Sequence, residues 1–264
     1  MENCTLLIST YNWPQALDLC LQSVMKQSKL PKEIVIADDG SDRDTAEIID
    51  KYRIVNKVPI KHVWQEDLGF RKSLIMNKAV KGASYEYIVQ IDGDVILNRN
   101  FIEDHLIVAE RSTFVRGTRA HIRKEYVQEM FLNSQSDFKF YSKGIKNRFN
   151  AIRLPSLSWL VSKRELSGRS VRGCNMAFWK TDFVQVNGYN NDLKGWGHED
   201  EELATRLVNN GIIKKSVKFR CIQYHIFHPL ASRELENIHD DLLFDVRNNK
   251  IIRCENGYEN SFYK

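Results

Sequence analysis

Residues 87–94 read Tyr-Ile-Val-Gln-Ile-Asp-Gly-Asp, an apolar run that ends in two carboxylates one residue apart. An apolar run of this length is typical of a buried strand, and in open α/β sheets ligands bind beyond the carboxyl ends of the strands. The oxygens of Asp92 and Asp94 suit a hard divalent cation that also contacts a phosphate. An Asp-Gly-Asp triplet also forms ordinary turns, so the triplet alone leaves both interpretations open.

The pattern on both sides of this stretch predicts an α/β fold. Strand-like runs cover residues 4–9, 34–37, 60–64 and 87–91, and helical spacing of apolar residues covers 14–24, 46–52 and 70–80. The first helix is expected to begin at Pro14 with Asn12 as its cap. Strands and helices that alternate at this spacing favour a mostly parallel, doubly wound sheet. The chain has no GxGxxG and no GxxxxGK followed by Ser or Thr, so the usual glycine-rich phosphate loops are absent.

The composition is that of a globular protein with ample core. At 264 residues the chain is long enough for one large α/β domain or two small ones. Its five cysteines are scattered and form no CxxC pair, which favours reduced thiols over a disulfide framework or a zinc site. The first residues lack the basic region of a signal peptide, and no run approaches the roughly 18 apolar residues of a membrane span. We therefore expect a soluble or peripheral protein of the cytoplasm.

Positive charge is concentrated in residues 111–172. This segment holds fourteen Lys or Arg and four acidic residues, a net charge of +10, while the whole chain carries +5. Such a segment attracts anions such as nucleic acid, anionic lipid or phosphorylated substrates. Apolar and aromatic residues interleave with these cations, namely Phe138, Phe140, Tyr141, Leu157, Trp159 and Leu160. A solvated basic face explains the charge equally well.

Two acidic clusters lie at the ends of predicted elements. Residues 38–41, Asp-Asp-Gly-Ser, close the second strand, where a carboxylate either forms a turn or accepts hydrogen bonds from a nucleoside. A clear helix begins at Glu199 with four acidic residues, which the helix dipole stabilises. The dipole does not explain residues 195–197, Gly-Trp-Gly, which present the flat face of Trp196 beside carboxylates. Because sugars stack on such faces and carboxylates accept their hydroxyl protons, we favour a saccharide site here.

Two histidines three residues apart follow another strand-like run at residues 219–224. A single buried histidine is more often a hydrogen-bonded core residue than a ligand. The pair His225 and His228, in a chain that already holds Asp92 and Asp94, strengthens a metal interpretation. A mixed carboxylate and imidazole set suits Mn²⁺ better than Ca²⁺.

These motifs, in this order, resemble those of inverting family 2 glycosyltransferases with the GT-A nucleotide-sugar fold. The C-terminal half resembles the galactosyltransferase-type region of β-1,4-galactosyltransferases, polypeptide N-acetylgalactosaminyltransferases and bacterial chondroitin-type polymerases. The matching motifs are LLISTYN (6–12), IVIADDGS (34–41), GFRKSLIMNKA (69–79), YIVQIDGDV (87–95), RGCNMAFWK (172–180), NGYNNDLKGWGHEDEEL (187–203) and HIFHP (225–229). The resemblance covers roughly residues 4–230. It implies an α/β fold with a single GT-A-type nucleotide-sugar-binding domain, a mostly parallel doubly wound sheet and a C-terminal acceptor-binding part.

For the donor, the resemblance implies that Thr10 and Asp39 hold uracil and ribose and that Arg71 closes over the nucleotide. Asp92 and Asp94 match the DxD pair, with Asp92 nearer the ribose and Asp94 on a metal that bridges the diphosphate. The same metal, Mn²⁺ or Mg²⁺, is expected to bind His228, with His225 as a second, softer ligand. The implied donor is a nucleotide sugar, with UDP favoured by the resemblance.

For the acceptor, Trp196 matches the aromatic residue that stacks on the sugar, and Asn175 is expected to contact the acceptor as well. Asp200, which follows Glu199, matches the general base, and these two residues form the expected catalytic pair. Animal galactosyltransferases have Gly where this chain has His198, which leaves open how the acceptor sits there. The implied reaction is a single displacement that inverts the anomeric centre. It moves a hexosyl or N-acetylhexosaminyl group to a hydroxyl of a saccharide or lipid-linked saccharide. The implied setting is the biosynthesis of a bacterial surface polysaccharide.

The expected organisation has four parts: a nucleotide-sugar half (1–110), a basic, partly helical insertion or lid (111–172), an acceptor, base and metal-histidine half (173–230) and a C-terminal tail (231–264). The basic segment is expected to contact anionic lipid at the inner face of the cytoplasmic membrane, and no nucleic acid is expected as a partner. Two alternatives remain, a nucleotidyltransferase that uses the same DxD-metal chemistry and a nucleic-acid-binding protein that uses the basic segment. The second leaves the carboxylates and late histidines without a role.

Overall fold

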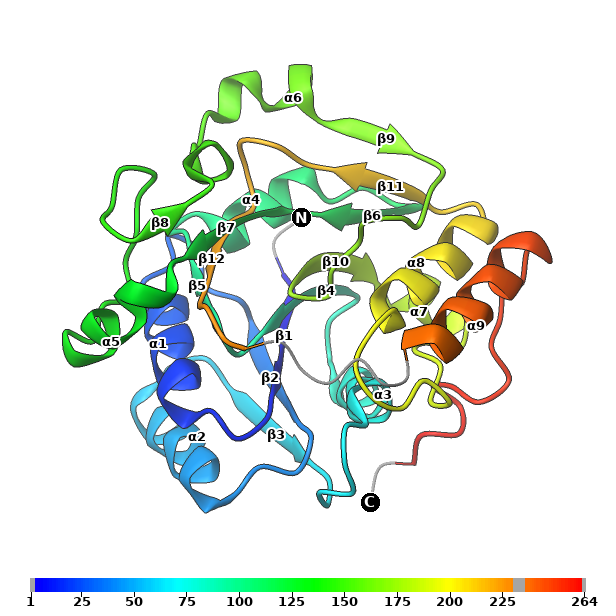
Figure 1. Cartoon of the computed structure of the whole chain (residues 1–264), viewed down its shortest axis with the longest axis horizontal. Coiled ribbons are helices and arrows are strands. Elements are labelled where there is room, and N and C mark those ends of the chain that lie inside the picture. The colour runs from blue at the N-terminus through cyan, green and yellow to red at the C-terminus, as the bar shows by residue number, and fades with distance from the viewer. Residues whose placement is uncertain (1–2, 230–235, 263–264) are drawn as a thin grey trace.

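The computed structural model describes residues 3–229 and 236–262 and is built on an eight-stranded sheet (Figure 1). Its strand order is β3 (Ile60–Trp64), β2 (Glu33–Asp38), β1 (Thr5–Thr10), β4 (Tyr87–Asp92), β10 (Asn175–Trp179), β6 (Thr113–Arg116), β11 (Ile213–Ser216) and β9 (Lys163–Glu165). The first four strands in this order, β3, β2, β1 and β4, are parallel to one another, and β6 is parallel to β11. Strands β10 and β9 run antiparallel to their neighbours. The mostly parallel sheet that the alternating pattern predicted is confirmed.

Helices cover both faces of this sheet because successive side chains of a strand point to opposite sides. On one face Leu6 and Ile8 pack with α1 (Pro14–Met25), α2 (Arg43–Val55) and α4 (Phe101–Val108). On the other, Leu7 packs with α3 (Lys72–Gly82), α7 (Lys180–Gln185) and α8 (Glu199–Asn209). The central strands are therefore buried on both faces, which accounts for their continuous apolar sequence.

A second sheet of four strands lies beside the first, in the order β5 (Val95–Leu97), β12 (Ile222–His225), β7 (Thr118–Ile122) and β8 (Ile145–Lys146). Its apolar face packs with α1 and with α5 (Lys124–Leu132). The run predicted as a strand at 219–224 starts only at Ile222, because Phe219 and Cys221 have φ of 62° and 51°, outside the β region. The late start places His225 at the end of β12.

The expectation of Asn12 as the cap of the first helix was wrong, although the helix begins at Pro14 as predicted. Asn12 has a φ of 43°, and Trp13 takes the cap position without a side-chain hydrogen bond. The Asn12 Oδ1 atom instead accepts a hydrogen bond of 2.8 Å from the Asp42 N–H, and so joins the loops after β1 and β2. All five cysteines are buried and free, in agreement with the scattered pattern.

The segment 111–172 differs from a separate insertion, because it supplies β6 and β9 to the large sheet and β7 and β8 to the small one. Its remaining elements are α5, α6 (Ser158–Val161) and the short 3₁₀ turns η1 (Arg148–Ala151) and η2 (Pro155–Leu157). Phe138 is only 1% exposed and belongs to the core under the small sheet. In contrast, Trp159 and Leu160 of α6 are 75% and 58% exposed.

Beyond residue 235, the C-terminal part forms α9 (Glu236–Asn248), which packs against α8 (Figure 1). The Asn209 side-chain amide of α8 donates to the carbonyls of Val246 and Ile251, at 3.0 and 2.8 Å. Arg247 of α9 also pairs with Glu201 of α8. Among the described helices, none is long and apolar enough to cross a membrane.

Candidate active site

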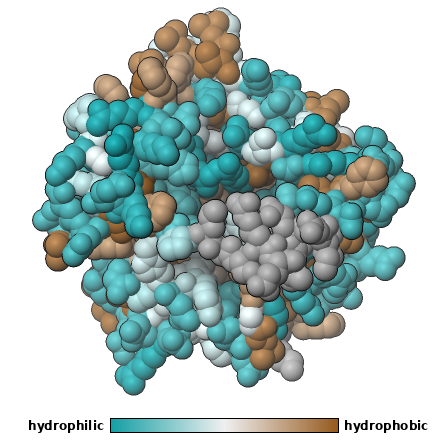
Figure 2. Space-filling model, viewed as in Figure 1, coloured by the Kyte–Doolittle hydropathy of each residue, from teal (hydrophilic) through white to brown (hydrophobic). Residues whose placement is uncertain are grey.

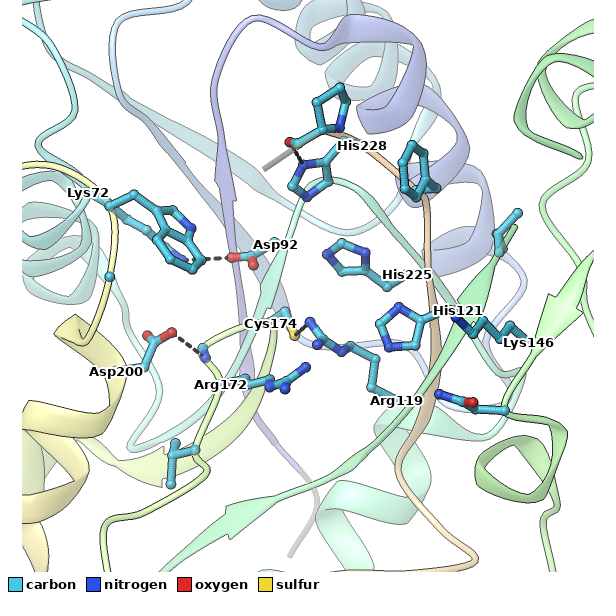
Figure 3. Close-up of a pocket in the computed structure, with 18 of the residues that line it drawn as sticks. Lys72, Asp92, Arg119, His121, Lys146, Arg172, Cys174, Asp200, His225 and His228 are labelled. Atoms are coloured by element: carbon cyan, nitrogen blue, oxygen red, sulfur yellow. Dashed lines mark hydrogen bonds and ion pairs between the residues drawn. The ribbon is translucent and has the colours of Figure 1, made fainter. Parts of the chain in front are cut away.

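The strand order reverses between β1 and β4, and Asp92 stands at this point. In doubly wound sheets such a reversal opens a crevice at the carboxyl ends of the strands, where ligands bind. The register pairs Ser9 with Asp92, and the Ser9 hydroxyl donates to Asp92 Oδ1 at 2.6 Å. Lys72 Nζ, from the first turn of α3, lies 3.1 Å from the same oxygen (Figure 3). Although burial opposes ionisation, Lys72 and Ser9 hold the pKa of Asp92 below its usual value.

A carboxylate and two imidazoles meet at the end of the small sheet. Asp94 Oδ2 lies 3.4 Å from His225 Nε2 and 3.1 Å from His228 Nε2. One ligand atom from each residue falls within 4.8 Å of the others. The antiparallel pairing of β12 with β5 sets His225 opposite Val95, next to Asp94 in the chain. This is the grouping expected from the sequence, brought together by strands more than a hundred residues apart.

This group fits a divalent metal. Asp94 Oδ1 is buried and has no hydrogen-bond partner among the described residues. The His228 Nδ1–H faces the Pro229 carbonyl at 2.7 Å, an outer contact that leaves Nε2 available as a ligand. The hydrogen bond to Asp94 raises the pKa of His228 to about 9, while burial lowers that of His225. Two imidazoles and a carboxylate are donors that Mn²⁺ accepts.

Asp200 is held rigidly at the start of α8. Its Oδ2 accepts a hydrogen bond of 2.6 Å from the Gly173 N–H, and its Oδ1 accepts one of 3.0 Å from the Tyr189 hydroxyl. The Tyr189 oxygen in turn accepts a hydrogen bond of 2.7 Å from Gln90 Nε2, on β4. A Cβ atom at Gly173 would lie 2.2 Å from Asp200 Oδ1, so this close approach requires glycine. The carboxylate direction is therefore set by the large sheet as well as by its own helix.

Lys72 links the two acidic groups of the site. Its Nζ lies 3.6 Å from Glu199 Oε1 in addition to its contact with Asp92. Burial alone would lower the pKa of Lys72, but Asp92, Asp200 and Glu199 outweigh it and raise this pKa well above its usual value. Burial and the neighbouring Asp200 raise the pKa of Glu199 to about 7, against the opposing effect of Lys72. Lys72 is thus a fixed cation between the end of β4 and the start of α8.

Asp200 and the two histidines line one pocket of about 1180 Å³. Its wall includes Asp92, Glu199, Asp200, Trp196, His225 and His228, whereas Asp94 contacts the histidines but does not line the pocket. Figure 3 shows Asp92 and Asp200 on one side, and His121, Arg119 and Lys146 on the other. The pKa of His121 falls to about 4, first through burial and then through the positive charge of Arg119. The pocket is therefore acidic at one wall and basic at the opposite one.

The predicted donor residues gather at the carboxyl ends of β1 and β2. Asp39 Oδ2 accepts a 2.7 Å hydrogen bond from the Arg71 N–H, Oδ1 accepts one of 2.6 Å from Gln65, and the Asp39 N–H donates to the Thr10 carbonyl at 3.1 Å. Burial raises the pKa of Asp39. These residues do not line the large pocket but lie next to Asp92 through strand β1. A ligand that spans from Thr10 to Asp200 would pass over the end of β4.

Asn175 does not extend into the large pocket. It is buried, and its side-chain amide donates to the carbonyls of Thr118 and Cys221 at 3.0 and 2.8 Å. His105 Nε2 lies 3.1 Å from Asn175 Oδ1. Asn175 thus joins β10 to the first residue of β7 and to the residue before β12. Asn175 lines a smaller pocket rather than the large one, and its contact with an acceptor stays a prediction.

The turn before α8 presents Trp196 through an unusual backbone. Gly195 and Gly197 have φ of 84° and 118°, a region that favours glycine. His198 adopts a φ of 66°, and its Nε2 lies 3.2 Å from Asp240 of α9. His198 lines the large pocket and also contacts the C-terminal helix, so this helix supports the turn.

Comparisons with known proteins identify the family of the chain. The model of glycosyl transferase family 2 matches residues 5–165, more than half of the chain. The chain belongs to this family. Residues 156–229 match a second family model, described as the N-terminal domain of galactosyltransferase. The two-part resemblance inferred from the motifs is confirmed.

Several curated relatives of this family 2 member are polysaccharide synthases, and others are validoxylamine A glucosyltransferases of Streptomyces hygroscopicus. The hyaluronan synthase of Pasteurella multocida is 26% identical over 248 residues, which are 88% of this chain and 25% of that protein. The chondroitin synthase of Escherichia coli is 24% identical over 252 residues, 89% of this chain and 36% of that protein. The chain thus spans about a quarter to a third of the length of these two relatives.

Solved glycosyltransferase structures share the fold. GalNAc-T7 with UDP, GalNAc and Mn²⁺ has a TM-score of 0.66 and 16% identity, and the alignment covers 95% of this chain and 51% of that one. Residues 1–349 of TarS from S. aureus, in complex with UDP-GlcNAc, have a TM-score of 0.64 and 16% identity, with 98% and 69% covered. The single-domain GT-A fold expected from the sequence is confirmed.

Sequence reasoning missed several residues that the structure brings to the site. Lys72 lies inside the motif at residues 69–79, next to Arg71. Its position at the start of a helix that follows a strand could have indicated a site residue. Gly173 and Tyr189 also lay inside motifs, but their contact with Asp200 depends on the packing of α8 against β10 and β4. Arg119 and His121 gave only the general signal of a basic segment.

Proposed function

We propose that this family 2 chain is an inverting, metal-dependent glycosyltransferase that moves a sugar from a UDP-sugar to a hydroxyl of a saccharide or lipid-linked saccharide in surface polysaccharide synthesis. One observation carries the proposal. A carboxylate fixed by two hydrogen bonds, Asp200, lines the same pocket as the histidines of a metal-competent group. A single displacement needs a base and a charge-neutralising group on opposite sides of one reacting carbon, and no enzyme nucleophile.

The donor part of the proposal rests on three residues and on the relatives. Thr10, Asp39 and Arg71 lie together beside Asp92, at the reversal point of the sheet where nucleotides bind. Solved neighbours contain UDP, and one contains UDP-GlcNAc. We therefore propose a UDP-linked hexose or N-acetylhexosamine as donor.

Asp94, His225 and His228 would hold the metal, Mn²⁺ or Mg²⁺. A bound divalent metal supplies Lewis-acid neutralisation of the charge on a departing diphosphate. Lys72 places a further positive charge 3.1 Å from Asp92, on the side of the nucleotide residues. The chain itself thus offers a cation where negative charge develops in the leaving group.

Asp200 would act as the general base. Its carboxylate is held by the Gly173 N–H and the Tyr189 hydroxyl, so it needs no reorientation to accept a proton from an acceptor hydroxyl. Trp196 offers a face for the acceptor sugar in the same pocket. Glu199 contributes indirectly, through its contact with Lys72.

We further propose that the chain binds peripherally to anionic lipid at the inner face of the cytoplasmic membrane. Leu157, Trp159 and Leu160 are exposed, and the last two belong to α6. Figure 2 shows apolar surface at the top of the molecule, where Figure 1 places α6. They belong to the segment with a net charge of +10. Exposed apolar side chains beside cations are the combination that binds the interface of an anionic bilayer.

A donor screen tests the proposed reaction. The purified chain is incubated with UDP-, GDP- and dTDP-sugars, with Mn²⁺ or Mg²⁺ and a panel of saccharide acceptors, and the released phosphate compounds are identified. We expect acceptor-dependent release of UDP, and an anomeric configuration in the product opposite to that of the donor. Release of pyrophosphate with transfer of a nucleotide would support the nucleotidyltransferase alternative instead.

A further inference from the structure

The basic wall of the pocket contains cations that lack a counter-ion. Arg119 and Arg172 form no ion pair with any carboxylate whose side chain the structure describes. Arg153 and Arg206, by contrast, pair with Asp104 at 2.7 Å and with Glu202 at 2.6 Å, whereas the half-buried Arg71 and Arg116 likewise have no ion pair with a described carboxylate. Arg119 is half-buried and Arg172 is exposed. A partly buried cation without a partner loses hydration without compensation, so Arg119, with the further charge of Arg172 beside it, favours an external anion in this pocket.

A smaller pocket of about 220 Å³ continues the large one at this wall. Arg119, Arg172 and His121 line both pockets, and Arg116 and Lys218 line the smaller one. The described residues around the smaller pocket include no Asp or Glu. Burial and the neighbouring Arg116 lower the pKa of Lys218, in line with a positive potential there. The smaller pocket is thus a cationic extension of the active-site pocket.

This extension lies next to the proposed base. Arg172 and Cys174 flank Gly173, whose N–H holds Asp200, and consecutive Cα atoms are only about 3.8 Å apart. Arg119 Nη1 lies 3.6 Å from Cys174 Sγ. Figure 3 shows the Arg119 and Arg172 side chains in the space between Asp200 and His121. The two guanidinium groups therefore face the volume that an acceptor beside Asp200 would occupy.

The donor does not account for these arginines. Thr10, Asp39 and Arg71 line neither pocket, and the metal-competent group and Lys72 already stand where a diphosphate is expected. A planar guanidinium binds carboxylate or phosphate through two parallel hydrogen bonds. An anion on the acceptor is the remaining occupant.

We propose that Arg119 and Arg172 bind an anionic group of the acceptor, either the carboxylate of a hexuronic acid or the phosphate of a phosphate-linked saccharide, and thereby select acidic acceptors. The inference rests on the proposed function, since it takes Asp200 to face the acceptor hydroxyl. It adds an anion subsite within about one sugar of the reacting group.

Equilibrium binding of matched probes tests this subsite. By calorimetry, with UDP and Mn²⁺ present and at constant ionic strength, p-nitrophenyl β-D-glucuronide is compared with its neutral methyl ester, and N-acetylglucosamine 1-phosphate with N-acetylglucosamine. The first pair probes a carboxylate and the second a phosphate. The variants are Arg119→Gln, Arg172→Gln and Arg172→Lys. Arg169→Gln is the control, because this substitution removes the same charge at a site outside the pockets. Arg169 is exposed, lies three residues before Arg172 and lines neither pocket.

We expect the unaltered chain to bind at least one acidic probe about 10- to 100-fold more tightly than its neutral partner, the range for charge-assisted hydrogen bonds. Each Arg→Gln variant should lose at least tenfold of this preference, Arg172→Lys should retain part of it, and Arg169→Gln should retain all of it. Because Arg119 is half-buried, Arg119→Gln is the variant more at risk of not folding. If it does not fold, Arg172→Gln alone decides the test.

Two results would overturn the inference: equal binding of acidic and neutral probes by the unaltered chain, or Arg→Gln variants that lose UDP affinity while their acidic preference is unchanged. The second result would assign the arginines to the donor. Release of UDP from UDP-sugars, measured on the same preparations, reports the proposed function separately. A chain that prefers an acidic probe through Arg172 but releases no UDP would keep the anion subsite and refute the transferase.

Discussion

Replacement of Asp200 by asparagine should remove the proton acceptor and leave the site folded. The asparagine Oδ1 can accept the hydrogen bond of the Gly173 N–H, which Asp200 now accepts at 2.6 Å. The new Nδ2–H can donate to the Tyr189 oxygen, because the Tyr189 hydroxyl can turn to donate to Gln90 Oε1, 3.0 Å away. Every polar group around the side chain thus keeps a partner, so little stability is lost.

The loss should appear in turnover alone. A positioned general base contributes about 10² to 10⁴ in rate, which corresponds to about 2.7 to 5.4 kcal/mol of transition-state free energy at roughly 1.36 kcal/mol per factor of ten. UDP affinity should stay within about twofold, because the residues expected to hold the nucleotide lie beyond Asp92. Steady-state release of UDP with a saturating acceptor measures the first quantity, and titration of UDP with Mn²⁺ measures the second.

Asp241→Asn provides the matched control, since Asp241 is exposed on α9 and the change of charge is identical. It should turn over like the unaltered chain. An Asp200→Asn enzyme with unchanged turnover would show that Asp200 only stabilises the start of α8, and the assignment of the base would be wrong. A large drop in UDP affinity or in melting temperature would show instead that the carboxylate has a structural role.

Three further predictions concern the metal, the pH dependence and the membrane. Asp94→Ala should weaken Mn²⁺ binding by more than the roughly 10- to 100-fold that loss of an outer contact costs and abolish transfer; full activity with excess chelator would contradict the metal assignment. The pKa of Glu199 lies at about 7, above its usual 4.5, so the folded state retains its proton and loses stability as pH rises from about 4.5 to 7. Glu199→Gln should therefore melt higher than the unaltered chain at pH 8 and equally at pH 5, and an equal difference at both pH values would refute the shift. In liposome flotation the chain should bind anionic vesicles at low salt and release at high salt, with about 1 kcal/mol from each engaged cation; Trp159→Ser with Leu160→Ser should weaken binding, and no association with anionic vesicles at low salt would end the idea.

The sequence alone predicted the elements and the identity of the chemical groups. Buried parallel strands need continuous apolar runs, and amphipathic helices need apolar residues every three to four positions. Both signals are local, so β1 to β4, α1 to α3 and the start of α8 at Glu199 could be read directly from the chain. The carboxylates and histidines were also visible, because their types and their places after strands are written in the chain.

Only the tertiary structure decided how these groups meet. His225 reaches Asp94 because β12 pairs with β5, a contact between residues some 130 apart for which no local pattern codes. Packing also separated Phe138, which is buried, from Trp159, which is exposed, although both lie in the same basic and aromatic segment. The sequence therefore determined which side chains were available, whereas pairing across the sheets and the close approach at Gly173 determined which of them share a site. The physical reason is that propensity and periodicity act over a few residues, while burial, strand register and charge pairing depend on residues that only folding brings together.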